Sequence, residues 1–182
     1  MYRPFTAALR LAVPAATLCT TPALADELFA GAYVHEVDTP LTLKTAESGA
    51  DVVVGYRFAR IEGLKAVGKP APYVIASVNT AGDTSFAGGG LSWKIGRGAL
   101  YLRPAIGFVV HDGKRHRIDA AAGRDYGLGT RWLFEPEFGI GYRASERLSV
   151  EASWMHVSNG RLLDKYQNPG IDNLGLRVNL RM

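Results

Sequence analysis

The seven residues from Trp154 to Gly160 contain a histidine and a serine whose spacing could support hydrolysis. His156 and Ser158 are two residues apart, so on a β-strand both side chains point to the same face. The earlier residues on that face are all apolar: Trp154, Ala152, Val150 and Leu148. A serine becomes a nucleophile when a base takes its proton. This pair, at the end of an apolar stripe, would suit a hydrolase whose substrate is a lipid.

A third group that could orient the base follows in the next segment. Asp172 opens the alternating segment 172–182 and shares its apolar face with Leu174 and Leu176. A single loop joins this segment to the one that carries His156, so we expect the two to be antiparallel neighbours. A serine, a base and an orienting carboxylate would then meet on the lipid-facing rim. Asp164, in the middle of the loop, is the other aspartate after the motif.

The elements that must position these residues are predicted to be strands. Alternation of apolar and polar residues dominates the chain, and helical periodicity is hard to find. Eight segments show it: 28–37, 51–60, 72–79, 84–95, 98–111, 127–142, 146–158 and 172–182. Several reach the roughly ten residues that a tilted strand needs to cross a bilayer. The sequence therefore predicts an all-β protein, an eight-stranded antiparallel transmembrane β-barrel.

The polar faces of these segments predict a filled, charged interior. An eight-stranded barrel is only wide enough for side chains to fill it, so charges inside must pair. The expected inward members are Arg57, Arg103, Arg131, Arg177, Arg181, Glu135, Glu137 and Glu151. We favour this salt-bridge role for Glu135 and Glu137 over a catalytic pair of carboxylates.

The connections favour an outer-membrane topology. Short turns at 96–98 and 143–145 are typical of the periplasmic side, and long connections at 37–49, 112–126 and 159–170 of the outside. The first periplasmic turn, 61–69, is longer than this pattern favours. On this count the seventh strand runs outward, which places His156 and Ser158 at the outer-leaflet end.

Residues 1–25 are predicted to be a secretory signal peptide, which leaves 26–182 as one barrel domain. Arg3 and Arg10 precede or flank a short apolar run, and Ala23–Ala25 suits a cleavage site. Cys19, the only cysteine, would leave with the signal, so disulfide and thiol chemistry are excluded. The remaining 19 basic and 17 acidic residues are nearly balanced, which argues against general nucleic-acid binding.

The densest basic cluster lies in the loop from His111 to Arg117. Lys114, Arg115 and Arg117 could grip phosphate groups of a lipid, because basic side chains suit phosphate oxygens. A solvated loop explains the same residues equally well. The histidines of this loop form no recognised metal-ligand pattern.

The segments His156–Gly160 and Asn168–Asp172 resemble the lipid A 3-O-deacylase family, the PagL-type acyloxyacyl hydrolases. The close match covers about the last thirty residues. The resemblance implies an outer-membrane barrel with a serine-hydrolase site facing the lipid and no cofactor or metal. It makes His156 the base, Ser158 the nucleophile and Asp172 the acid, and it links Asn159 to the oxyanion site.

Two features depart from the family pattern, and two further points remain open. The best-known member has a glutamate as the acid, and this chain ends in Met182 rather than in the terminal aromatic residue common in outer-membrane barrels. Gly160 is either a loop glycine or a residue whose backbone N–H approaches the oxyanion. The sequence also leaves open whether the barrel forms a homodimer.

The expected function is therefore removal of the 3-O-linked 3-hydroxyacyl chain from lipid A of lipopolysaccharide. The alternative from another class is a small non-enzymatic barrel that serves adhesion or membrane integrity. The lipid A mass of cells with and without the protein would separate the two. A calcium-dependent phospholipase is disfavoured, because the chain is short and has no evident acidic calcium cluster.

Overall fold

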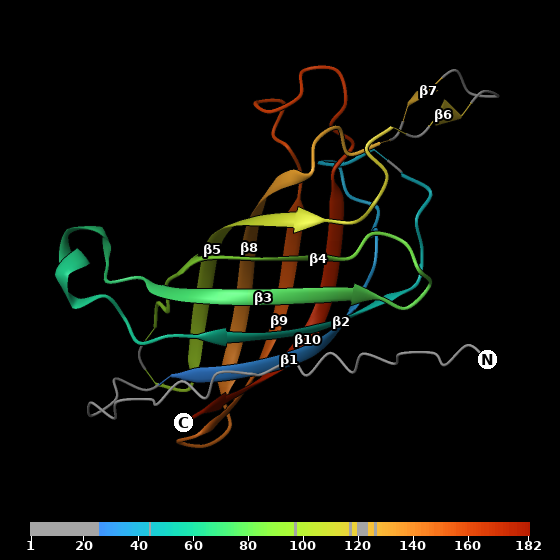
Figure 1. The fold of residues 1–182 in the computed structure, drawn as a ribbon. Coiled ribbons are helices and arrows are strands. Elements are labelled where there is room, and N and C mark those ends of the chain that lie inside the picture. Colours follow the sequence, from blue (N-terminus) through green and yellow to red (C-terminus); the bar gives the residue numbers. More distant parts are fainter. Residues whose placement is uncertain (1–25, 44, 97, 117, 120–123, 126) are drawn as a thin grey trace, which may run out of the picture.

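Eight strands close into an antiparallel barrel in the computed structural model (Figure 1). Around the barrel the order is β1-β10-β9-β8-β5-β4-β3-β2. Their bounds are β1 Glu27–Val34, β2 Ala50–Arg57, β3 Ala71–Asn79, β4 Phe86–Ser92, β5 Leu100–His111, β8 Trp132–Arg143, β9 Leu148–Val157 and β10 Ile171–Arg181. The predicted fold class and the number of barrel strands are confirmed.

The structure describes residues 26–182 except 44, 97, 117, 120–123 and 126. The predicted signal peptide, 1–25, lies outside the described residues. The side chains of the short strands β6 (Ile118–Asp119) and β7 (Arg124–Asp125) are likewise not described.

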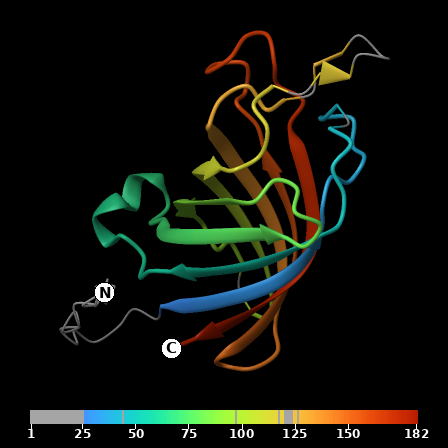
Figure 2. The same cartoon turned by 45° about the vertical axis from the view of Figure 1, so that its right-hand side comes forward.

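The two ends of the barrel differ in the length of their connections (Figure 2). At the long-loop end lie the connections 35–49, 112–131 and 158–170, and β6 and β7 pair as a small hairpin that projects from it. At the short-turn end, the connection after β2 contains a short 3₁₀ helix, η1 (Glu62–Val67), in place of a tight turn. No helix in the described part of the chain is long and apolar enough to cross a membrane.

The outer wall is apolar because outward positions alternate with buried ones along every long strand. On β10, for example, Leu174, Leu176 and Val178 are each about half exposed. Aromatic rings gather near both ends: Phe108 stacks on Trp132 at 5.4 Å near the long-loop end, and Tyr56 meets Phe58 at 5.0 Å near the other. Such paired girdles are typical of barrels that span an outer membrane.

The interior is filled by a network of arginines and glutamates, as predicted. Glu151 is fully buried and accepts hydrogen bonds from Arg103 Nε at 2.8 Å and from Arg177 Nε at 2.7 Å. Arg177 also donates to Glu137, and its guanidinium lies 5.0 Å from the centre of the Phe29 ring. Glu137 and Glu151 are therefore met by opposite charge, which offsets the cost of removing them from water. Glu135, also predicted to form a salt bridge, instead accepts a hydrogen bond from Tyr73 and has no ion pair among the described residues.

Three further details of the prediction were wrong. The segment 127–131 is not part of a strand: the Leu128 and Gly129 amides bond to the carbonyls of Lys114 and Arg115, and Gly129 has φ +79°. Arg131 therefore lies in the loop, where it bonds to carbonyls of 111 and 113, and not in the interior. Arg181, at the last position of β10, is exposed at the short-turn end.

We predict that Glu151→Gln lowers the free energy of unfolding by about 3–5 kcal/mol, because it removes the buried carboxylate charge that Arg103 and Arg177 share. The measurement is denaturant unfolding of the folded barrel in detergent, followed by tryptophan fluorescence. Glu146→Gln, in the exposed turn after β8, is the matched control and should change it little. Equal stability of the two variants would contradict a structural role for the network.

Candidate active site

His156 and Asp172 are directly opposite each other in the register of β9 and β10. Both lie on the outward-facing row of their strands, as predicted, and their side chains bond: His156 Nδ1 lies 2.7 Å from Asp172 Oδ1. A carboxylate can only accept, so Nδ1 carries the proton of the neutral ring. Nε2 is then left with its lone pair, the form that a general base requires.

Asp172 is fully buried although it lies on the outer wall. Trp154, two residues before His156 on the same face, donates its indole N–H to Asp172 Oδ1 at 3.1 Å. Thr39 and Thr42, from the loop after β1, donate their hydroxyls to Asp172 Oδ2. These three side chains and His156, here called the aspartate clamp, satisfy a charge that would otherwise be costly beside lipid.

The loop after β1 is also held to this site by its backbone. The Val37 amide donates to the Asp172 carbonyl at 2.7 Å, and the Leu43 amide donates to the Pro169 carbonyl at 2.9 Å. Gly170 lies between the loop and the imidazole: a Cβ there would be 2.9 Å from His156 Cε1 and 3.1 Å from Thr42 Cγ2. With φ +70° as well, this position suits glycine for both conformation and space.

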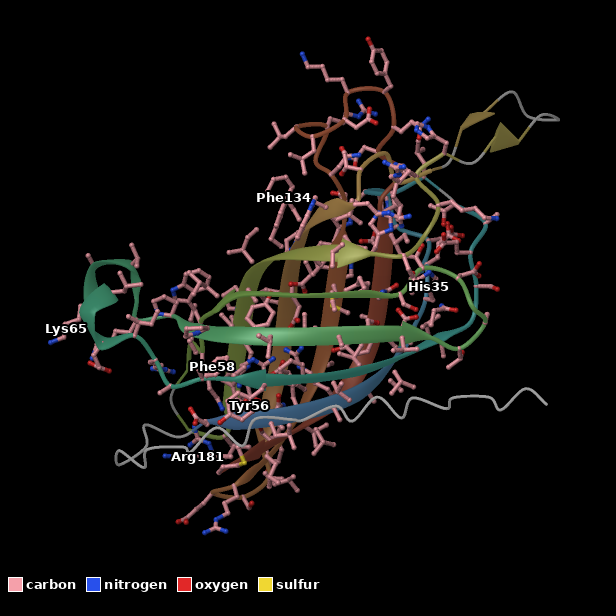
Figure 3. All side chains as sticks on the ribbon, in the orientation of Figure 1. His35, Tyr56, Phe58, Lys65, Phe134 and Arg181 are labelled. Atoms are coloured by element: carbon pink, nitrogen blue, oxygen red, sulfur yellow. The ribbon has the colours of Figure 1, made fainter. Side chains whose placement is uncertain are left out.

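Ser158 follows the last residue of β9 and still pairs with β8. Its backbone exchanges hydrogen bonds of 2.7 and 3.1 Å with Phe134, a residue toward the long-loop end of the barrel (Figure 3). Ser158 is 6% exposed. Within the described residues no hydrogen bond joins the Ser158 hydroxyl to His156. The structure thus brings His156 and Asp172 into contact. It places Ser158 two residues after His156, without a hydrogen bond between the serine hydroxyl and the imidazole.

Asn159 and Gly160 begin the loop between β9 and β10. The Asn159 side chain is fully buried; its Nδ2 donates to the carbonyls of Leu128 and Gln167, and its Oδ1 accepts from the Arg161 amide. Its own amide donates to Asn168 at 2.8 Å. Asn159 therefore organises two loops. Gly160 is exposed, with φ +64°, and in the described part of the chain its amide N–H has no hydrogen-bond acceptor.

The remaining predicted site residues lie in the loop after β5. Lys114 and Arg115 are exposed there, and Arg117 lies outside the described residues. Asp164 accepts hydrogen bonds from the amides of Tyr166 and Gln167 within its own loop and does not contact His156. Among the described residues, no group of three His, Cys, Asp or Glu side chains could hold a metal ion.

A buried polar cluster inside the barrel anchors the loop that reaches Asp172. His35, one residue past β1, lies between Asp51, at 3.0 Å, and Glu47, at 2.9 Å (Figure 3). Asn173, the inward neighbour of Asp172, donates to Asp51 and accepts from the Glu36 amide. Burial by itself lowers the pKa of His35, but the hydrogen bonds and charges of Asp51 and Glu47 outweigh it and raise this pKa to about 9.

The closed barrel, its apolar wall and its structural relatives define an outer-membrane β-barrel protein. The crystal structure of the outer membrane enzyme PagL is similar with a TM-score of 0.60 and 17% identity, over 86% of this chain and 99% of that one. Neisserial surface protein A matches with a TM-score of 0.53 and 11% identity, over 86% and 97%. A de novo designed transmembrane β-barrel matches with 0.52 and 14%, over 89% and 98%. These likenesses concern the fold.

The family follows from the sequence itself. Residues 47–181 match the family model described as lipid A 3-O-deacylase (PagL), and the chain belongs to that family, whose enzymes are hydrolases that deacylate lipid A. The resemblance seen in the last thirty residues is thereby confirmed and extends over most of the barrel. No relative was found among the curated protein sequences.

Sequence reasoning missed three members of the aspartate clamp. Trp154 shares the face of His156, and this position could have suggested a role, but its apolar neighbours favoured a plain lipid contact. Thr39 and Thr42 lie 133 and 130 residues before Asp172, in a loop whose sequence has no alternating pattern. Nothing in their spacing indicates that contact.

We predict a pH dependence of stability that belongs to His35. Its folded pKa of about 9 lies above the 6.5 of a free histidine side chain, so its contribution to stability is complete below pH 6.5 and is lost as the pH rises through 9. Thermal unfolding midpoints measured from pH 6 to 10 should therefore fall more steeply for the native protein than for His35→Gln. His116→Gln is the control for a histidine in an exposed loop. Parallel curves for native protein and His35→Gln would contradict the assignment.

Proposed function

We propose that this protein is a serine esterase that removes the ester-linked 3-hydroxyacyl chain at the 3-O position of lipid A. The observation that carries the proposal is the hydrogen bond from His156 to the buried Asp172 on the outward-facing wall. A base oriented in this way beside a serine is the arrangement of a serine hydrolase. Its place on the outer wall, near the long-loop end, is where the acyl chains of an outer-leaflet lipid would lie.

In the proposed reaction, Ser158 Oγ attacks the ester carbonyl carbon while His156 Nε2 takes its proton. Asp172 stabilises the imidazolium and keeps the ring in the required tautomer. The tetrahedral intermediate then collapses, and the sugar hydroxyl leaves with the proton from His156. Water, activated by the same ring, releases the fatty acid from Ser158. Before the attack, the serine hydroxyl must rotate toward Nε2; such bonds are often long in substrate-free enzymes and tighten in the substrate complex.

We propose that Asn159 and Gly160 form the oxyanion site and that the two residues have different roles in it. The Gly160 amide N–H has no hydrogen-bond acceptor among the described residues. Because Gly160 is only two residues after Ser158, this N–H can donate to the negative charge that develops on the ester oxygen. The Asn159 side chain holds the loop that presents Gly160, and it could donate itself only after releasing the carbonyl of Leu128 or Gln167. Lys114, Arg115 and Arg117 are proposed to contact lipid A phosphates from the loop after β5.

The nucleophile is tested by Ser158→Ala, which should lower the hydrolytic rate on the order of a million-fold, the usual cost of removing a nucleophilic serine. Fatty-acid release from lipid A by purified, folded protein is the assay. Ser153→Ala is the matched control, because Ser153 is on the same strand and faces the barrel interior. Substantial turnover by Ser158→Ala would remove Ser158 from this role, and no turnover by the native protein would favour a non-enzymatic barrel.

The acid is tested by comparing two aspartates. Asp172→Asn should lower the rate by about 10²- to 10⁴-fold, because an amide cannot stabilise the imidazolium or select its tautomer. Asp164→Asn should change the rate by less than about threefold, since an asparagine oxygen can accept the same two amides. Asp172→Glu should retain partial activity.

Equal losses from the two asparagine variants would leave Asp172 without a distinct role. A loss from Asp164→Asn alone would move the acid into the loop. The fold of each variant is checked by its gel mobility before and after heating, so that a loss of activity is not confused with a loss of the barrel.

A further inference from the structure

The short-turn end of the barrel contains a cavity of about 400 Å³, at the opposite end from His156. Seven basic side chains and three acidic ones line it. It opens where the aromatic residue Phe58 marks the edge of the apolar wall, and Arg181 lies at the same end (Figure 3). Neither the family's activity nor the proposed reaction uses this cavity.

Two of the three acidic side chains in the lining already have basic partners. Glu27 accepts hydrogen bonds from Arg57 at 2.9 Å and Arg103 at 2.7 Å, and it lies 3.7 Å from Lys94. Glu62 pairs with Lys69 at 2.7 Å. The third, Glu146, is a single exposed carboxylate in the turn after β8. The acidic groups therefore do not neutralise the basic lining.

Apart from Arg60, which donates to the Lys94 carbonyl at 3.2 Å, three arginines of the lining have no acidic partner in the part of the chain that the structure describes: Arg143, Arg147 and Arg181. They come from separate places in the chain, the end of β8, the following turn and the end of β10. The backbone nevertheless brings two of them together, since the Arg181 amide donates to the Arg147 carbonyl at 2.8 Å. All three line the same cavity, and guanidinium groups suit the oxygens of a phosphate, which they bind through paired hydrogen bonds.

A buried group in the lining points to the same kind of ligand. Arg57 is 3% exposed, and its Nε–H has no hydrogen-bond acceptor within the described residues. Asn179, whose oxygen accepts from Arg57 Nη1 at 2.8 Å, also has a buried Nδ2 without an acceptor. Both unsatisfied atoms are donors, and buried donors without a partner indicate a missing water or anion. The excess of basic side chains favours an anion.

We propose that this cavity is a binding site for a phosphate group, held by Arg143, Arg147 and Arg181 at the mouth and by Arg57 deeper inside. The volume suits a ligand the size of a lipid headgroup. The cavity opens on the periplasmic side, so the phosphate can come from a phospholipid of the inner leaflet or from a soluble phosphate compound. The site is independent of the proposed esterase, since it lies at the other end of the barrel.

The test uses the folded full-length barrel in a neutral detergent, labelled with ¹⁵N-arginine, and follows the Nε–H signals by NMR. The probes are inorganic phosphate, short-chain phosphatidylglycerol and, as a lipid without net charge, short-chain phosphatidylcholine. We expect saturable shifts that include Arg57 Nε–H. Binding of phosphatidylglycerol alone would identify a lipid ligand, and binding of inorganic phosphate a soluble one; both support the site.

The decisive comparison is between two triple variants of equal net charge. Arg143→Gln/Arg147→Gln/Arg181→Gln should weaken binding about tenfold or more, the loss that even one charge-assisted hydrogen bond would produce. Lys65→Gln/Arg161→Gln/Lys165→Gln, exposed and outside the lining, should leave it unchanged. Equal weakening by both triples, or no saturable shift with either phosphate or phosphatidylglycerol, would overturn the proposal. Ester hydrolysis, measured in parallel, tests the other end separately.

Discussion

Closure of the sheet between β1 and β10 is the constraint on which the rest of this structure depends. In a bilayer every backbone polar group needs a partner within the protein, and pairing from Glu27 with Arg181 to Val34 with Leu174 removes the last open edges. Once the sheet is closed, each strand has one face toward lipid and one toward a narrow interior. The arginine–glutamate network and the apolar wall are the two consequences of this division.

The candidate active site is the place where this division is broken. Asp172 puts a carboxylate on the lipid-facing row, and His156 puts a titratable ring beside it. The structure satisfies the charge with hydrogen bonds: Trp154, on the same strand as His156, donates its indole N–H, and Thr39 and Thr42 donate their hydroxyls from the loop after β1. The clamp satisfies the carboxylate and, in the same contacts, sets the orientation that a base needs.

The two faces of β10 cooperate at this point. Asp172 faces outward and receives the loop, while its neighbour Asn173 faces inward and joins the cluster of His35 and Asp51 that holds the start of the same loop. The loop is therefore anchored inside the barrel and acts outside it. At the opposite end of the barrel, Arg143, Arg147 and Arg181 line one cavity together with residues of the connection after β2.

The sequence by itself determined the barrel, its filled interior and the shared face of His156 and Asp172, because strand periodicity and the pairing of consecutive strands are local properties. The prediction was wrong for Arg131 and the segment 127–131. The alternating pattern begins at 127, but the strand begins only at Trp132, after Gly129 has turned the chain. Only the tertiary structure decided the contacts of Thr39 and Thr42 with Asp172, and the position of Arg143, Arg147 and Arg181 around one cavity. Each set includes residues that lie far apart in the sequence and come to the same end of the barrel only when the sheet closes, so no spacing along the chain predicts their positions.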